Sequence, residues 1–186
     1  MKKFSSVLVA GTLILLVSCG TKKSEGGGMS DATKKNMDAN AGVLKMFETG
    51  DYSKIGDYIA ADAVDHAGPK GDIKGLDSIK AYFTQMTAMM SGMKNDVIKT
   101  LADDEYVMCW MKGTATAKVD IPEWGMKAGD SHTGEAIEVS KYKDGKAIEH
   151  WSFTSAAEMM QMMEAMKNAP KKMDEKVMAP AKDTAK

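Results

Sequence analysis

The spacing of apolar residues along the first half of the chain predicts three helices. Apolar side chains recur every three or four positions between Asp31 and Gly50, with Ser30 or Asp31 as the cap and Gly50 as the stop. A second, short helix is expected over residues 52–59. A third is expected to begin at residues 75–77. It continues along an apolar stripe made of Ile79, Phe83, Met86, Met90 and Met93, which Tyr82 and Met89 widen.

Strand-like patterns dominate the rest of the chain. Residues 62–66 form a short candidate strand before the third helix, and the Asp144-Gly145 pair is typical of a tight hairpin. Ser155 is a candidate cap for a closing helix that is rich in methionine. The other candidate strands cover residues 96–101, 105–118, 133–142 and 147–154. Helices followed by an antiparallel meander indicate the α+β class.

The N-terminal segment has the features of an export signal. Lys2 and Lys3 precede an apolar run, residues 7–17, which is shorter than the about 20 residues that a membrane-spanning helix needs. The run ends in Leu16-Val17-Ser18-Cys19, which resembles the bacterial lipobox. That resemblance implies that the Cys19 thiol receives a diacylglycerol group and that the chain is cut before this cysteine. A plain secretory signal with an incidental cysteine is the alternative.

These segments divide the chain into four parts. We expect residues 1–18 to be a lipoprotein signal peptide, 19–30 a lipidated cysteine with a glycine-rich tether, 31–168 one folded domain and 169–186 a disordered polar tail. The expected location is the bacterial cell envelope, with a membrane as partner through the lipid on Cys19. The next residue, Gly20, is not the aspartate linked to inner-membrane retention, which favours the outer membrane in a cell that has two.

Composition argues against several functions. All 25 basic residues are lysines and the net charge is −1, and the lack of arginine argues against a nucleic-acid partner. Three scattered histidines without a ligand spacing argue against a metal site, and no cofactor is implied. Because Cys19 is committed to lipid, Cys109 has no partner for a disulfide and is expected to be a buried, inert thiol.

Four stretches resemble the SnoaL-like branch of the NTF2-like superfamily, across residues 43–153. They are ETGDY after the first helix, IAADAVDHAGP, KGLDSIKAYF and, most specific of the four, YKDGKAIEHWSF. The resemblance implies a cone in which a curved antiparallel sheet is wrapped by the N-terminal helices around a pocket, with the methionine-rich helix at the C-terminal end. Members of this family include polyketide cyclases, isomerases and dehydratases.

Two positions depart from the cyclases of that family. Those cyclases carry an aspartate as general acid/base directly after the last-strand tryptophan, where this chain has Ser152. Many also have a histidine in a Gly-Thr-His-Thr-Gly stretch, where this chain has Ala115. A serine hydroxyl cannot replace the carboxylate at neutral pH without a base of its own. An enzyme would therefore need a displaced acid, for which Asp65 and Glu149 are the candidates.

The candidate site residues lie on the last strand and on the short early strand. Strand alternation puts His150 and Ser152 on one face together with Ile148, whereas Asp65 and His66 point to opposite faces. His66 could meet His150 across the pocket, Asp65 could cap a turn, and His150 could instead be a core-edge histidine satisfied by the backbone. The expected pocket is lined by Tyr82, Met86, Trp110, His66, His150 and Ser152.

Three functions remain open from the sequence. The favoured one is a binding module that holds a small apolar or amphipathic molecule at the membrane. The second is a cyclase- or isomerase-type enzyme that uses the displaced acid. The third, which can accompany either, is a homodimer formed through the outer face of the sheet. Residues 106–111 support it, because Tyr106, Met108 and Trp110 make one face of this strand apolar while Val107, Cys109 and Met111 do so for the other.

Methionines gather in the third helix and in the closing helix. Thioether sulfur is a soft ligand suited to Cu(I), which an envelope protein could meet. Methionine also fills irregular cores and adaptable apolar pockets, and the stripe on the third helix coincides with the face expected to be buried. Core packing or pocket lining is therefore the favoured interpretation, with Cu(I) ligation as the alternative.

Overall fold

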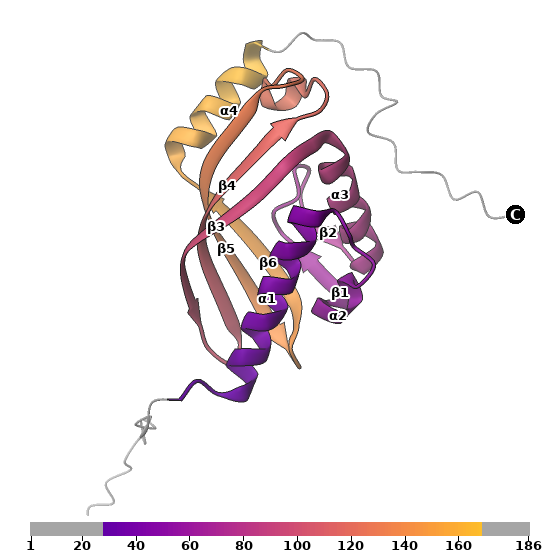
Figure 1. The fold of residues 1–186 in the computed structure, drawn as a ribbon, viewed down its shortest axis with the longest axis vertical. Helices are drawn as coiled ribbons and strands as arrows, with labels where there is room; N and C mark the ends of the chain where they lie inside the picture. The colour runs from indigo at the N-terminus through magenta and orange to yellow at the C-terminus, as the bar shows by residue number, and fades with distance from the viewer. Residues whose placement is uncertain (1–27, 169–186) are drawn as a thin grey trace, which may run out of the picture.

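The computed structural model describes residues 28–168 of the 186-residue chain, and the predictions for the signal peptide, for most of the tether and for the tail lie outside this part. Within it, one curved six-stranded sheet in the order β2-β1-β6-β5-β4-β3 combines with four α-helices, which confirms the α+β class (Figure 1). The helices are α1 (Asp31–Thr49), α2 (Ile55–Tyr58), α3 (Leu76–Met89) and α4 (Ala156–Asn168), with a 3-10 turn η1 (Pro122–Trp124). The strands are β1 (Ile59–Asp65), β2 (Ile73–Lys74), β3 (Met90–Ala102), β4 (Tyr106–Ala117), β5 (Ser131–Lys143) and β6 (Lys146–Thr154).

Helix α1 is attached at its start to the turn between β3 and β4. Ser30 caps the helix, as expected, because its Oγ accepts a hydrogen bond from the Thr33 N–H at 3.0 Å. The Thr33 hydroxyl donates to the Asp104 carboxylate at 2.7 Å, and the Asn36 amide donates to the Asp104 carbonyl at 3.0 Å. Gly50 ends the helix in the left-handed conformation, with φ of 71°. These contacts place α1 along the sheet, where it contacts β3, β4 and β6.

The sheet consists of an antiparallel meander, β3 to β6, which one parallel pairing extends beyond β6. Strands β3 to β6 pair antiparallel in chain order, as expected. Strand β1 then pairs parallel with β6, so that Asp65 lies opposite His150, and β2 pairs antiparallel with β1. The sheet was expected to be antiparallel, and among the described strands the pairing of β1 with β6 is the one exception. A parallel pairing joins strands that are distant in sequence, and local apolar patterns carry no sign of it.

A β-bulge in β6 decides which of its side chains face the concave side of the sheet. The turn at Asp144 and Gly145 has φ of 55° and 78°, as in the expected tight hairpin. Tyr142 pairs with Ala147, but Lys141 pairs with Glu149, so Ile148 is an extra residue in β6. A bulge of this kind reverses the alternation beyond it. The expectation that Ile148 and His150 share a face through regular alternation is therefore wrong.

Helix α3 ends earlier than the apolar stripe suggests. Met90 has φ of −118° and ψ of 156°, and it begins β3 by pairing with Ala117. The register of β3 shifts between Ser91 and Lys94, and Gly92 has a positive φ of 60°. A bulge lets two strand residues that are three positions apart face the same side. Met90 and Met93 therefore imitate helical spacing although they belong to a strand.

The main core fills the space between the concave face of the sheet and helices α1 and α3. Its buried members include Met46, Tyr52, Ile79, Phe83 and Val107. The opposite, convex face exposes Tyr106, Met108 and Trp110, so strand β4 is apolar on both sides, as predicted. Helix α4 contacts η1 and follows the last strand near the far end of the sheet from the start of α1 (Figure 1).

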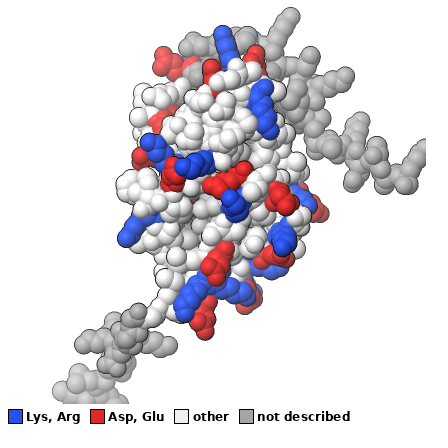
Figure 2. Space-filling view, viewed as in Figure 1, with Lys and Arg blue, Asp and Glu red and all other residues white. Residues whose placement is uncertain are grey.

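The surface carries mixed charge. In the view of Figure 2, lysine and acidic side chains alternate over the visible face without a continuous patch of one sign. Among the residues that the structure describes, no helix has both the length and the apolar character needed to cross a bilayer. Met159, Met160 and Met163 on α4 are each at least half exposed, so these three do not fill the core.

Candidate functional site

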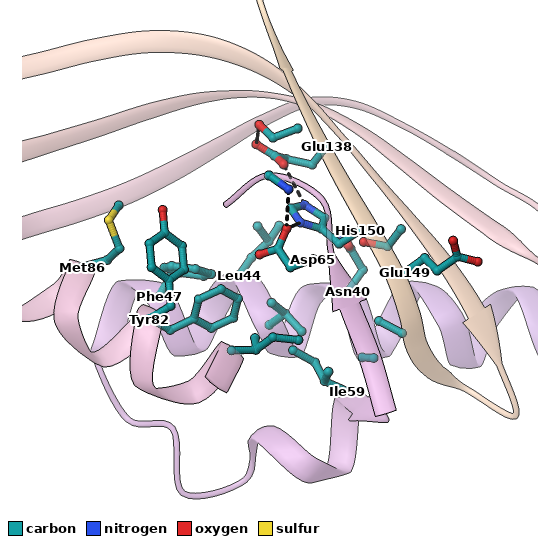
Figure 3. A pocket seen from close by; sticks show the side chains of 18 of the residues that line it. Asn40, Leu44, Phe47, Ile59, Asp65, Tyr82, Met86, Glu138, Glu149 and His150 are labelled. Carbon is teal, nitrogen blue, oxygen red and sulfur yellow. Dashed lines mark hydrogen bonds and ion pairs between the residues drawn. The ribbon is translucent and has the colours of Figure 1, made fainter. Parts of the chain in front are cut away.

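A mostly apolar pocket opens between the concave face of the sheet and helices α1 and α3 (Figure 3). It has a volume of about 310 Å³. Pockets that take small organic molecules begin at about this size, at roughly 300 Å³. Most of its wall is aliphatic or aromatic, contributed among others by Leu44, Phe47, Ile59, Phe83, Met86 and Met111. A pocket of this kind has room for one small apolar molecule.

One end of the pocket is polar and is built around His150. His150 Nδ1 lies 2.9 Å from Asp65 Oδ1, and His150 Nε2 lies 2.8 Å from Glu138 Oε2 (Figure 3). The Ser152 hydroxyl donates to the other oxygen of Glu138, Oε1, at 2.9 Å. Asp65 Oδ1 also accepts the backbone N–H of Ala67 at 2.9 Å. We call Asp65, Glu138, His150 and Ser152 the polar cluster.

Three adjacent strands deliver the polar cluster. The parallel pairing places Asp65 of β1 opposite His150 of β6, and the antiparallel pairing places Glu138 of β5 opposite Ser152 of β6. Side chains on neighbouring strands at the same register stand on the same face about 5 Å apart, which is close enough for direct contact. The bulge at Ile148 turns His150 and Ser152 toward the concave side.

The two carboxylates hold a proton on His150. Burial alone would lower the pKa of the imidazole, but the hydrogen bonds and negative charges of Asp65 and Glu138 outweigh it and raise the pKa to about 9. Burial also works against ionisation of Asp65, yet the hydrogen bond and charge of His150 leave the pKa of Asp65 below its ordinary value. At neutral pH the cluster therefore contains an imidazolium between two carboxylates.

This protonation state limits the chemistry of His150. Both ring nitrogens are engaged by carboxylates, so the imidazole is not a free base. The two hydrogen bonds of Asp65 to His150 and to Ala67 both use Oδ1, so Oδ2 of this pocket-lining side chain takes part in neither. Tyr82 also lines the pocket, and burial together with the charge of Asp65 raises the pKa of its phenol. Tyr82 is therefore a neutral hydroxyl at neutral pH.

The structure brings some of the predicted site residues together. Tyr82, Met86, His150 and Ser152 line the pocket, and so does the displaced-acid candidate Asp65. Asp65 also caps the turn at Ala67, which was one of its expected roles.

Two predicted lining residues, His66 and Trp110, lie elsewhere, and their assignment to the pocket is corrected. The His66 ring stacks on Trp151 with centroids 4.9 Å apart, and its Nδ1 lies 2.9 Å from the Asp72 carboxylate. Its contact with His150 is through the backbone, where the His66 N–H donates to the His150 carbonyl at 2.8 Å. Trp110 is 44 % exposed on the convex face, because it alternates with the buried Cys109 and Met111.

Glu149, the other displaced-acid candidate, has its carboxylate outside the polar cluster. It accepts a hydrogen bond from Lys141 at 3.1 Å and lies 3.5 Å from His66 Nε2, and in Figure 3 it points away from His150. The Lys141 ammonium is the main cause of a lowered pKa for Glu149. An ionised carboxylate in an ion pair is a poor general acid at neutral pH.

Glu138 was not among the predicted site residues. Its signal in the sequence is the alternation of Glu138, Ser140 and Tyr142 along one face of β5, with Ser140 and Tyr142 buried. Three polar or amphipathic residues in such a row do not distinguish a pocket from an exposed edge. Within residues 28–168, the structure shows no group of three or more histidine, cysteine or acidic residues arranged to hold a metal ion.

A cone-shaped α+β domain with a curved sheet, N-terminal helices and an apolar pocket with a polar end defines the NTF2-like class. The family model described as SnoaL-like polyketide cyclase matches residues 38–163, and the chain belongs to this family. The match covers most of the described domain, which confirms the resemblance seen in the sequence.

Solved structures share this fold at low sequence identity. IdmH from Streptomyces antibioticus is 22 % identical, with a TM-score of 0.56, over 69 % of this chain and 98 % of its own. A SnoaL-like protein from Jannaschia sp. CCS1 is 12 % identical, with a TM-score of 0.64, over 78 % and 100 %. An LEH-like epoxide hydrolase of M. tuberculosis is 12 % identical, with a TM-score of 0.58, over 75 % and 90 %. Among curated proteins, none matches significantly.

Proposed function

We propose that this chain is an envelope lipoprotein whose SnoaL-like domain binds a small, mostly apolar molecule next to the membrane. The observation that carries the proposal is the pocket itself, about 310 Å³ of mostly apolar space with one polar end. Apolar walls supply the free energy of transfer from water, and a few polar groups orient the ligand. The polar cluster supplies the polar groups that would orient the ligand.

Native mass spectrometry of the mature protein extracted from its own envelope tests this proposal. We expect an additional small-molecule mass on the wild-type chain. Met86→Trp should remove it, because Met86 lines the pocket and a larger ring there fills the space. Met160→Trp is the matched control, since Met160 is 70 % exposed on α4. Identical small-molecule occupancy in the two variants, or none in the wild-type protein, would contradict the proposal.

A second candidate is a proton-transfer enzyme of the cyclase or isomerase type. The observation that favours it is Asp65, a carboxylate inside the pocket whose Oδ1 is oriented by His150 while Oδ2 takes part in neither of its hydrogen bonds. A carboxylate in this position can accept a proton from a carbon next to a carbonyl group, with Asp65 in the role that family cyclases give to the aspartate replaced here by Ser152.

Proton exchange of simple enolisable ketones, followed by NMR, separates the two candidates. An enzyme should catalyse exchange with the wild-type chain and lose at least 100-fold in rate in Asp65→Asn, since a general base contributes about 10²–10⁴-fold. Asp62→Asn is the control, because Asp62 lies on the same strand but is exposed. A binding module should show no exchange above the buffer rate in any of these proteins.

The lipid anchor rests on Leu16-Val17-Ser18-Cys19 in the sequence. We predict that Cys19→Ser abolishes incorporation of labelled palmitate and leaves an uncleaved precursor, because the thiol is the atom that receives the lipid. Ser18→Ala keeps a small residue before the cysteine and should be processed normally. Labelling of the Cys19→Ser protein at the wild-type level would contradict the anchor.

A homodimer through the convex face of the sheet is also part of the proposal. Leu101, Met108 and Trp110 are each at least 40 % exposed on β3 and β4, and Ile137 and Phe153 extend this apolar surface over β5 and β6. Apolar surface of this extent on one face usually marks an interface.

We predict that light scattering of the purified protein gives a dimer mass that Trp110→Lys lowers to a monomer mass. A charge buried without a partner at an interface opposes association. Val119→Lys serves as the control, because Val119 is equally exposed but lies outside the strands. A monomer mass for the wild-type chain at high micromolar concentration would contradict the dimer.

A further inference from the structure

The charges around the pocket do not balance. The polar cluster holds the carboxylates of Asp65 and Glu138 and a single cation, the imidazolium of His150. Among the residues that the structure describes, no lysine lines the pocket, and the chain has no arginine. The third acidic residue at the wall, Glu149, is neutralised from outside by Lys141 at 3.1 Å. The pocket is therefore left with one negative charge that no side chain of its wall compensates.

The uncompensated charge is placed where a ligand can reach it. Asp65 is only 3 % exposed, and its Oδ2 takes part in neither of its hydrogen bonds. Both oxygens of Glu138 are already acceptors, one for His150 and one for Ser152. Among the described residues, the oxygen that these hydrogen bonds leave over is Oδ2 of Asp65, on a side chain that lines the mostly apolar pocket. Two largely buried carboxylates that share one cation keep an excess negative charge, which is costly, and a ligand cation with an N–H donor offsets this cost.

We infer that the pocket selects apolar molecules that carry one protonated amine and rejects those that carry a carboxylate or a phosphate. This inference rests on the proposed function, since it names the class of ligand for the same pocket. The ammonium group donates to Asp65 Oδ2, and the apolar part of the molecule lies against Leu44, Phe83 and Met86. An anionic headgroup at the same place would face two carboxylates in a partly buried site, where electrostatic repulsion is stronger than in bulk water.

The test uses three naphthalene derivatives that differ in one group: 1-naphthylmethylamine, 1-naphthalenemethanol and 1-naphthoate. Each is titrated by calorimetry at pH 7 into the mature chain in phosphatidylcholine nanodiscs, with empty nanodiscs to subtract partition into lipid. We expect the amine to bind at least tenfold more tightly than the alcohol, and the carboxylate to bind most weakly. Met86→Trp should abolish binding of the amine and of the alcohol, which places both in the pocket.

Two variants that remove one negative charge locate the effect. Asp65→Asn and Glu138→Gln should each reduce the advantage of the amine over the alcohol at least fivefold. Asp62→Asn removes the same charge from the exposed side of β1 and should keep the wild-type ranking. Circular dichroism shows whether the Asp65→Asn protein is folded. If it is unfolded, Glu138→Gln alone tests whether the preference for the amine depends on the negative charge of the polar cluster.

The outcomes separate this inference from the proposed function. Equal affinities for the amine and the alcohol, or tightest binding of the carboxylate, overturn the inference and leave a pocket that binds apolar molecules. A preference for the amine that persists in both Asp65→Asn and Glu138→Gln also overturns it, because the preference then arises elsewhere. Binding of none of the three probes overturns the inference and the proposed function together. The ranking on the wild-type chain decides the inference even where neither variant folds.

Discussion

Replacing His150 with alanine is expected to lower the free energy of unfolding by about 3 kcal/mol. The substitution leaves the carboxylates of Asp65 and Glu138 on the same face of the sheet without the cation between them. Removing one partner of a buried ion pair costs about 3–5 kcal/mol, and the lower end applies because the His150 side chain is 30 % exposed. Urea unfolding followed by circular dichroism measures the difference.

The matched control for this prediction is His132→Ala. His132 is exposed on β5, so its loss should change the free energy of unfolding by less than about 0.5 kcal/mol. A His150→Ala protein as stable as the His132→Ala protein would mean that the imidazolium does not hold the two carboxylates together.

The stability of the wild-type chain should fall by about 3 kcal/mol between pH 6.5 and pH 9. His150 has a pKa of about 9 in the folded chain against an ordinary value of 6.5. A raised pKa stabilises the folded state fully below pH 6.5, and this contribution is lost as the pH rises through 9. Each unit of difference corresponds to about 1.4 kcal/mol. Urea unfolding at intervals of half a pH unit measures the slope.

At acid pH, stability is expected to change with pH in the opposite direction, because of Asp65. The pKa of Asp65 is lower in the folded chain than its ordinary value of 3.8, so its contribution is present above that pH and is lost as the pH falls further. His66 also has a raised pKa, mainly through its hydrogen bond to Asp72, and titrates in the same direction as His150. The part of the pH dependence that is due to His150 is therefore the difference between two slopes, those of the free energy of unfolding against pH in the wild-type and His150→Ala proteins. Equal slopes in the two proteins would contradict the prediction.

The polar cluster also bears on the choice between binding and catalysis. Ser152 stands where the family cyclases keep their acid, and here its hydroxyl orients Glu138. Glu138 in turn holds His150, and His150 holds Asp65. The carboxylate with an oxygen outside these hydrogen bonds is therefore that of Asp65 on β1, and not a group at the end of β6. An enzyme built on this pocket would use a different strand for its base, whereas a binding module needs only the charge.

The helices and strands follow from local patterns in the sequence. Apolar spacing and caps predicted α1 and the start of α3, and the Asp144-Gly145 pair predicted the hairpin of β5 and β6. Alternation in β4 predicted two apolar faces, one with Val107, Cys109 and Met111 and the other with Tyr106, Met108 and Trp110, but it placed Trp110 in the pocket, whereas the structure exposes it. These features were predictable because each depends on residues within one turn of helix or a few strand positions. The same holds for the motifs that placed the chain in its family.

The site depended on contacts that the sequence alone did not determine. Counting back from the Lys143–Lys146 pair, a regular hairpin would place Glu138 opposite Trp151 and turn Glu149 inward. The bulge at Ile148 shifts this register by one, so that Ser152 faces Glu138 and His150 faces the pocket. The parallel pairing of β1 with β6 then brings Asp65 to His150 across 85 positions of sequence. Strand register and long-range pairing are set by the packing of the whole sheet, which is why only the tertiary structure could decide them.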